Sequence, residues 1–369
     1  MRRGMRFAMV GLAGCLVTAL ADVGERVRAE EPGSWSRAAA AAYLDARQDW
    51  WMDWPTAARD HGTFCVSCHT AMPYALARTA LRTGAEQSPV AVESRLLKNV
   101  EKRVTAWDEI EPFYSDEAYR AGKTSESRGT EAILNALILA NRDARAATLS
   151  DAGRQAFANL WAQQVSTGDT AGAWPWLDFG LEPWETQTAQ YYGAALAAVA
   201  IGGAPGGYAS TPGIQPAVTR LREYLGREAD RQHLFNRLTV LWASDALPGV
   251  LDRHQRRAII AEAMGQQRAD GGWSLSSLGM FDRRDGSALE TASDGYATGL
   301  VTYALQRAGV MPDDPGLERG LAWLRAHQDP DGSWPASSLN KERDPTSDRG
   351  RFMRDAATAY AVLALTAGG

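Results

Sequence analysis

The chain has 369 residues, a formal net charge of −5 and 45% hydrophobic residues. This length and composition suit one large or two ordinary globular domains with a substantial core. Basic residues are not in excess, so the composition argues against nucleic acid as a partner.

The N-terminal segment, residues 1–29, has the composition of an export signal. An arginine-rich start precedes an apolar run over residues 7–20, which is too short for a comfortable membrane span. We expect a signal peptide cleaved after Ala21 or after Ala29. The mature chain is then one domain over residues 30–369, located in the periplasm or secreted.

Cys15 allows a second interpretation of this segment. Leu12-Ala13-Gly14-Cys15 resembles a bacterial lipobox, in which Cys15 would be lipidated and would anchor a lipoprotein to a membrane. The simpler interpretation is that Cys15 lies in the apolar core of a signal that is removed whole. A lipobox at Cys15 would leave only residues 7–14 as the apolar core, which is short.

The stretch Cys65-Val66-Ser67-Cys68-His69 carries the strongest chemical pattern in the chain. Two cysteines separated by two residues and followed at once by histidine are typical of covalent haem c attachment. Each thiol can add to a haem vinyl group, and the adjacent imidazole can then reach the iron. We therefore expect one haem c on Cys65 and Cys68, with His69 as the proximal iron ligand. Haem c is attached to an unfolded chain after translocation, which favours ordinary secretion over the twin-arginine route suggested by Arg2-Arg3.

Two other uses of this motif stay open. A thioredoxin-like redox pair needs a strand before the motif and a helix after it, whereas the flanks look wholly helical. A zinc site needs a second pair of ligands, and the sequence has no other CxxC, HxxxH or Cys/His cluster. After signal removal Cys65 and Cys68 are the only cysteines, which is not the pattern of a disulfide framework.

From Ser36 onward the pattern is almost entirely helical. Charged amphipathic helices alternate with helices rich in alanine and glycine. The amphipathic helices are expected at residues 38–51, 90–107, 151–164, 214–226, 253–267 and 316–328. The small-residue helices are expected at residues 70–83, 130–141, 186–201, 232–247, 290–308 and 352–365. Paired in this way, they predict an all-α fold, an α6/α6 toroid with the small-residue helices inside; an open helical solenoid is the alternative.

A repeated turn containing glycine and tryptophan joins the two helix types. The segment from Gln267 to Trp273 matches the segment from Gln328 to Trp334, and a looser copy runs from Gln164 to Trp174. These turns resemble the QW-type repeats of squalene–hopene cyclases, whose α/α-toroid superfamily includes protein prenyltransferase β subunits. The resemblance covers most of residues 38–369 and implies the fold.

The same resemblance does not carry either activity with it. Class II cyclases use an Asp-x-Asp-Asp acid motif, and the nearest match here is the isolated Asp294. No Asp-Asp-x-x-Asp diphosphate motif is present. The prenyltransferase zinc site needs a cysteine, and both cysteines of the mature chain lie in the CxxCH motif.

The CxxCH motif occupies the same slot as the glycine/tryptophan turns, between the first outer and the first inner helix. We therefore expect the haem at the rim where the inner helices begin, over or partly inside the mouth of the ring. Helix N-termini or Arg128, Arg351 and Arg354 are expected to meet its propionates.

A second iron ligand would distinguish electron transfer from binding of a small ligand. His233, at the start of the fourth inner helix, is the preferred distal candidate, although a solvated or hydrogen-bonded histidine explains it more simply. Met353, at the start of the sixth inner helix, is a weaker candidate. His61 would require its loop to fold back, and Met72 lies on the wrong side of the ring plane.

Three acidic residues, Glu290, Asp294 and Asp355, are candidate catalytic groups at the same rim. Capping of the inner helices explains them more simply. No Ser-His-Asp, P-loop or paired-carboxylate signature is usable in this sequence.

Three hypotheses for the function follow from these observations. The first is a metal-binding haem oxidoreductase or electron-transfer protein, acting with a redox partner or on a small apolar substrate in the toroid cavity. The second is a non-catalytic haem module that carries electrons or binds and senses a ligand. The third is a haem-free, terpene-cyclase-like protein.

Overall fold

The computed structural model describes Met1 and residues 34–82, 88–114 and 120–367. Contacts divide the chain into residues 1–32 and residues 33–369, and the described helices and strands lie in the second unit. The expected cleavage sites after Ala21 and Ala29 and the lipobox cysteine Cys15 lie outside the described residues. None of the helices in the described ranges has the length and apolarity needed to cross a bilayer.

The second unit is built from α-helices, and all twelve expected helices are present. The outer helices are α1 (Arg37–Asp53), α3 (Ala91–Thr105), α5 (Asp151–Ala162), α7 (Gln215–Glu228), α9 (Arg253–Gly265) and α11 (Pro315–Ala326). The inner helices are α2 (Ala71–Leu81), α4 (Arg120–Asp143), α6 (Ala189–Gly203), α8 (Leu234–Ala246), α10 (Gly295–Arg307) and α12 (Phe352–Thr366). A short antiparallel ribbon, β1 (Ala58–Arg59) and β2 (Thr63–Phe64), precedes the CxxCH motif.

Local sequence explains where several of these helices begin. Ser36, Ser150, Asp252 and Asp314 occupy the N-cap positions of α1, α5, α9 and α11, and each side chain accepts a backbone N–H of the first turn. The inner helix α6 is alanine-rich and almost wholly buried. Small side chains allow such helices to pack closely around a common axis.

Two inner helices differ most from the expected bounds. Helix α10 begins at Gly295 rather than Glu290, because Asp294 is extended and its N–H donates to the carbonyl of Trp273 at 2.8 Å. Helix α4 begins at Arg120, well before Thr130. Its early turns are held by Glu126, whose carboxylate accepts the N–H of Asp178 at 3.1 Å.

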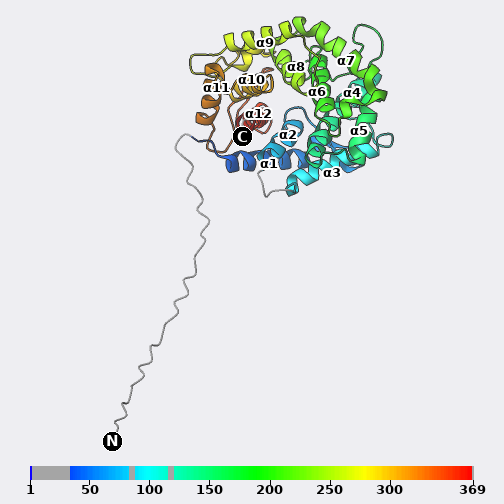
Figure 1. The fold of residues 1–369 in the computed structure, drawn as a ribbon, viewed down its shortest axis with the longest axis horizontal. Helices are drawn as coiled ribbons and strands as arrows, with labels where there is room; N and C mark the ends of the chain where they lie inside the picture. Colours follow the sequence, from blue (N-terminus) through cyan, green and yellow to red (C-terminus); the bar gives the residue numbers. More distant parts are fainter. Residues whose placement is uncertain (2–33, 83–87, 115–119, 368–369) are drawn as a thin grey trace. The chain divides into compact units, whose positions relative to one another are not determined.

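The inner helices form a closed ring, as Figure 1 shows. Each inner helix packs against the next in chain order, and α12 packs against α2. The outer helices surround this ring and contact the inner helices that they precede or follow. The α/α toroid is therefore confirmed, and the open solenoid is wrong.

The repeated turns have one geometry. The indole N–H of the turn tryptophan donates to a carbonyl in the last turns of the preceding outer helix: Trp174 to Leu160 at 2.7 Å, Trp273 to Ala263 at 2.6 Å, and Trp334 to Leu324 at 2.8 Å. These tryptophans are fully buried. Their role is to join the end of an outer helix to the start of the next inner one, as expected for a structural repeat.

The glutamine that precedes each turn connects neighbouring repeats. The amide of Gln267 donates to Gly271 in its own turn and to Gly316 in the next outer helix, at 2.8 and 2.7 Å. Gln328 repeats this pattern with Gly332 and with Ser36, both at 3.0 Å. Because Ser36 precedes the first helix, this last bridge closes the ring between the two ends of the array.

Candidate functional site

The CxxCH motif lies in a fixed loop between β2 and α2. The indole N–H of Trp51 donates to the carbonyl of Cys65 at 2.7 Å. The Ser67 hydroxyl accepts the backbone N–H groups of Thr70 and Ala71, at 3.2 and 3.1 Å, and so caps the helix that follows. This loop holds both thiols and the imidazole on one short segment at the rim where the inner helices begin.

Both cysteines are buried and are not paired with each other. Burial raises the pKa of Cys65 to about 11, although Arg59 nearby lowers it. Burial also raises the pKa of Cys68, and the adjacent Glu185 carboxylate raises it further. The two thiols are thus neutral and share one carboxylate neighbour, Glu185.

The imidazole of His69 is surrounded by aromatic rings. It stacks on Phe352 with ring centroids 4.0 Å apart and meets the edge of Trp51 at 4.9 Å. The ring of Trp184 lies 5.7 Å away. Burial lowers the pKa of His69 to about 3, and the positive charge of Arg47 adds to this effect. The imidazole is therefore neutral, which is the form that ligates metals.

A buried polar network lies behind His69. Its Nδ1 is 2.8 Å from the Thr70 hydroxyl, which is 2.7 Å from Oδ2 of Asp355. Asp355 also accepts the Tyr43 hydroxyl at 3.0 Å and two N–H groups of Arg47 at 2.8 and 3.1 Å. Burial raises the pKa of Asp355, whereas Arg47 and the two hydroxyl donors lower it.

A pocket of about 140 Å³ opens beside His69. Its lining includes a histidine, a methionine, two arginines, two glutamates and apolar residues. The lining residues are His69, Leu181, Glu182, Trp184, Glu185, Ser338, Asn340, Arg343, Arg349, Phe352 and Met353. Burial raises the pKa of Glu185 to about 7, so this carboxylate changes charge near neutrality.

The arginines expected at this site are not the ones that line the pocket. Arg128 donates to the carbonyl of Ile110 at 2.6 Å, and Arg354 forms an ion pair with Asp329 at 2.5 Å. Neither these two nor Arg351 lines the His69 pocket.

Arg343 and Arg349 occupy that place instead. Both come from the loop before α12, which has no periodic pattern from which a position could be predicted. The only available signal was its density of charged residues, from Lys341 to Arg354. Burial lowers the pKa of Arg343, and the positive charge of Arg349 lowers it further. The guanidinium carbon of Arg349 lies 5.4 Å from the ring centroid of Trp54.

The candidate distal ligands lie in different places. Met353 is buried and lines the pocket together with His69. His233 lies against Phe281, with ring centroids 5.4 Å apart, and neither of its ring nitrogens has a partner among the described residues. It does not line the His69 pocket. His61 is about half exposed and forms a 2.7 Å pair with Asp60, and Met72 is fully buried.

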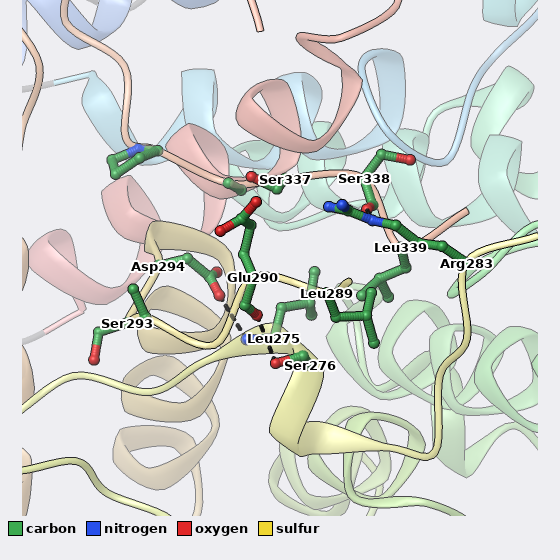
Figure 2. A pocket seen from close by; sticks show the side chains of 13 residues that line it. Leu275, Ser276, Arg283, Leu289, Glu290, Ser293, Asp294, Ser337, Ser338 and Leu339 are labelled. Atoms are coloured by element: carbon green, nitrogen blue, oxygen red, sulfur yellow. Dashed lines mark hydrogen bonds between the residues drawn. The ribbon is translucent and has the colours of Figure 1, made fainter. Parts of the chain in front are cut away.

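The three candidate acids do not form one site. Glu290 and Asp294 line a separate pocket of about 170 Å³, shown in Figure 2. Asp294 caps α10 by accepting the N–H of Ala297 at 2.9 Å, and it also accepts the N–H of Leu275 at 2.5 Å. Burial raises the pKa of Asp294 to about 7. Asp355 belongs to the network behind His69 rather than to this pocket.

Comparison with known proteins supports the fold. No family model matches the chain. Over 74 residues it is 35% identical to the squalene–hopene cyclase of Bradyrhizobium diazoefficiens; this stretch is 20% of the chain but only 11% of that enzyme. A glycosidase structure aligns with 90% of this chain and 98% of its own length, at 13% identity and a TM-score of 0.50.

Two further solved structures align with the chain. A glycosidase in complex with glucose, at 12% identity and a TM-score of 0.49, covers 90% of this chain and 98% of its own length. A polysaccharide lyase, at 13% identity and a TM-score of 0.45, covers 90% of this chain and 97% of its own length. The α/α-toroid architecture agrees with the glycosidase structure at a TM-score of 0.50, and that likeness concerns the fold alone.

One expectation from the sequence is corrected by these findings. The described residues contain no group of three or more His, Cys, Asp or Glu side chains that could hold a metal ion. The classification of the chain as a metal-binding haem oxidoreductase or electron-transfer protein is therefore wrong.

Proposed function

We propose that this chain is a non-catalytic haem-binding module, with one haem c covalently attached at Cys65 and Cys68. The observation that carries the proposal is the arrangement of the CxxCH loop. Two buried, unpaired thiols and a neutral imidazole occupy one fixed segment, and the imidazole residue lines a pocket. Haem c, when attached, supplies an iron centre that His69 ligates on the proximal side.

The residues around the pocket suit such a group. Phe352, Trp184 and Leu181 provide apolar surface for a porphyrin face. Arg343 and Arg349 both line the pocket, and guanidinium groups bind carboxylates such as the two propionates of a haem well. Glu182 has a buried carboxylate oxygen without a partner among the described residues, which indicates room for a further polar group.

We expect Met353, rather than His233, to be the second ligand of the haem iron. Met353 lines the same pocket as His69, and His–Met ligation is well known for c-type haem. A Met353 ligand would occupy the iron position that an added small molecule would otherwise take. Without that ligand, the haem would offer a position for a small molecule such as carbon monoxide. Export by the signal expected at residues 1–29 would place the chain where haem c is attached.

The proposal is tested by producing the full precursor with a cytochrome c maturation system. We expect a coloured protein whose pyridine haemochrome spectrum corresponds to two thioether bonds. The single variants Cys65→Ser and Cys68→Ser should each give the spectrum of one remaining thioether. Colourless, correctly exported protein with free thiols at both positions would exclude the proposal.

Carbon monoxide titration distinguishes the two distal candidates. Met353→Ala should convert a low-spin, carbon monoxide-resistant protein into one that binds the gas readily. His233→Ala should leave the spectrum unchanged. The opposite pattern would return the distal role to His233.

A second candidate function is a cyclase-type reaction that needs no haem. The match to squalene–hopene cyclase favours it, together with Asp294, whose pKa of about 7 suits a carboxyl group that donates a proton near neutral pH. This hypothesis predicts conversion of squalene by the wild type and by Cys65→Ser, and loss of conversion in Asp294→Asn. No product from squalene in the wild type would exclude it.

A further inference from the structure

The environment of His69 Nδ1 determines which ring nitrogen carries the proton. The Thr70 hydroxyl lies 2.8 Å from His69 Nδ1 and 2.7 Å from Asp355 Oδ2. A hydroxyl group has a single proton to donate. It can therefore donate to only one of these two neighbours and must accept from the other.

The donors around Asp355 decide the direction. Arg47, whose guanidinium is always charged, forms a two-point contact with both carboxylate oxygens of Asp355. Tyr43 donates a third hydrogen bond, at 3.0 Å. The Arg47 side chain is only 5% exposed, and its other partner, Asp348, is about half exposed. Asp355 is therefore the buried counter-ion of Arg47, and an ionised carboxylate only accepts hydrogen bonds.

The remaining protons follow by elimination. Because Asp355 only accepts, the Thr70 hydroxyl donates to it and so accepts a proton from Nδ1 of His69. A neutral imidazole protonated on Nδ1 carries its lone pair on Nε2. No described residue forms a hydrogen bond with Nε2, and His69 lines the pocket.

We propose that Thr70 and Asp355 are positioning residues that hold His69 as the Nδ1–H tautomer and leave Nε2 free to bind iron. Partners of this kind orient metal-ligating histidines and raise the basicity of the ring. The role of Nε2 as an iron ligand rests on the proposed haem function. The tautomer itself is a property of the polypeptide.

The test is a long-range ¹H–¹⁵N spectrum of the full chain, labelled with ¹⁵N-histidine and produced without the maturation system. The chain has five histidines, and His69→Gln identifies the signals of His69. We expect wild-type His69 to be protonated on Nδ1 and unprotonated on Nε2. Thr70→Val should shift the population severalfold toward the Nε2–H form, and Thr70→Ser should restore the wild-type spectrum.

Two results would overturn the proposal: an Nε2–H tautomer in the wild type, or an unchanged tautomer in Thr70→Val. The wild-type spectrum decides the first point even if Thr70→Val fails to fold. In protein that carries haem, Thr70→Val should also raise the midpoint potential, because a less basic ligand stabilises ferric iron less, and Thr70→Ser should reverse the rise. Failure of haem attachment would exclude the proposed function but would leave the tautomer result intact.

Discussion

The imidazole of His69 lies nearly parallel to the ring of Phe352, with an interplanar angle of 24° and centroids 4.0 Å apart. Phe352 is the first residue of α12, whereas His69 lies just before α2. This one stack therefore joins the first and the last inner helices at the rim. The two rings also define one wall of the pocket in which we place the haem.

Removal of this stack should cost stability. Phe352→Ala deletes a large, partly buried ring, and we expect unfolding to become easier by about 1–3 kcal/mol. Phe352→Leu keeps most of the apolar surface and should lose less. Urea unfolding followed by circular dichroism measures both variants. Equal losses in the two would show that the aromatic contact itself contributes nothing.

The buried pair of Arg103 and Glu131 gives a second prediction. Both side chains are 0% exposed, and Arg103 also donates to the Thr63 hydroxyl at 2.7 Å, in the strand that leads to Cys65. Glu131→Gln leaves the guanidinium charge buried without a counter-ion, and we expect a loss of about 3–5 kcal/mol. Chemical denaturation provides the measurement.

A surface pair provides the matched control for this variant. Arg95 and Asp53 also form an ion pair, but both side chains are largely exposed. Water and salt screen such a pair, so Asp53→Asn should leave the denaturation midpoint unchanged. Similar losses in the buried and the exposed variants would contradict the prediction.

Ring closure can be tested at Gly332. This residue has a φ of +88°, and a Cβ atom there would lie 2.2 Å from the carbonyl oxygen of Ala39 in α1. Gly286 has a similar φ of +74° but no atom within 4 Å of such a Cβ. Gly286→Ala should cost only the left-handed penalty of about 1–2 kcal/mol. Gly332→Ala should cost roughly 1–3 kcal/mol more, because the last turn is pushed away from the first helix.

Thermal unfolding of both alanine variants checks this comparison. If Gly332→Ala loses no more stability than Gly286→Ala, the contact between Gly332 and Ala39 accommodates the added methyl group without a free-energy cost. Limited proteolysis at the chain ends gives a second measure, since an opened ring exposes α1.

The carboxyl group of Asp294 makes stability depend on pH. Burial raises its pKa from 3.8 to about 7, so the folded state holds this proton more tightly than the unfolded chain does. Its contribution is therefore most favourable below about pH 4 and is lost as the pH rises toward 7. Asp294→Asn keeps an N-cap acceptor for α10 and should flatten this fall.

Urea unfolding of the wild type and of Asp294→Asn, measured at several values between pH 4 and pH 7, follows the effect. Asp294→Ser also caps the helix without titrating and should behave in the same way. Parallel pH profiles for the wild type and both variants would contradict the assignment.

The sequence by itself determined the helices and the position of the motif. All twelve helices follow from the alternation of charged amphipathic and small-residue segments, because each segment is long enough for a 3.6-residue period to be evident. The glutamine and tryptophan of the repeated turns also made the toroid predictable. The slot of residues 65–69 between α1 and α2 followed from this register.

Only the tertiary structure decided which side chains surround His69. Thr70 and Asp355 are 285 residues apart in the chain, yet they share a hydrogen bond. Arg343 and Arg349 come from an irregular loop, where no periodic pattern fixes the direction of a side chain. Periodicity reports which face of a helix is buried. It carries no information about which distant residue meets that face, because ring closure and loop packing are set by contacts across the whole molecule.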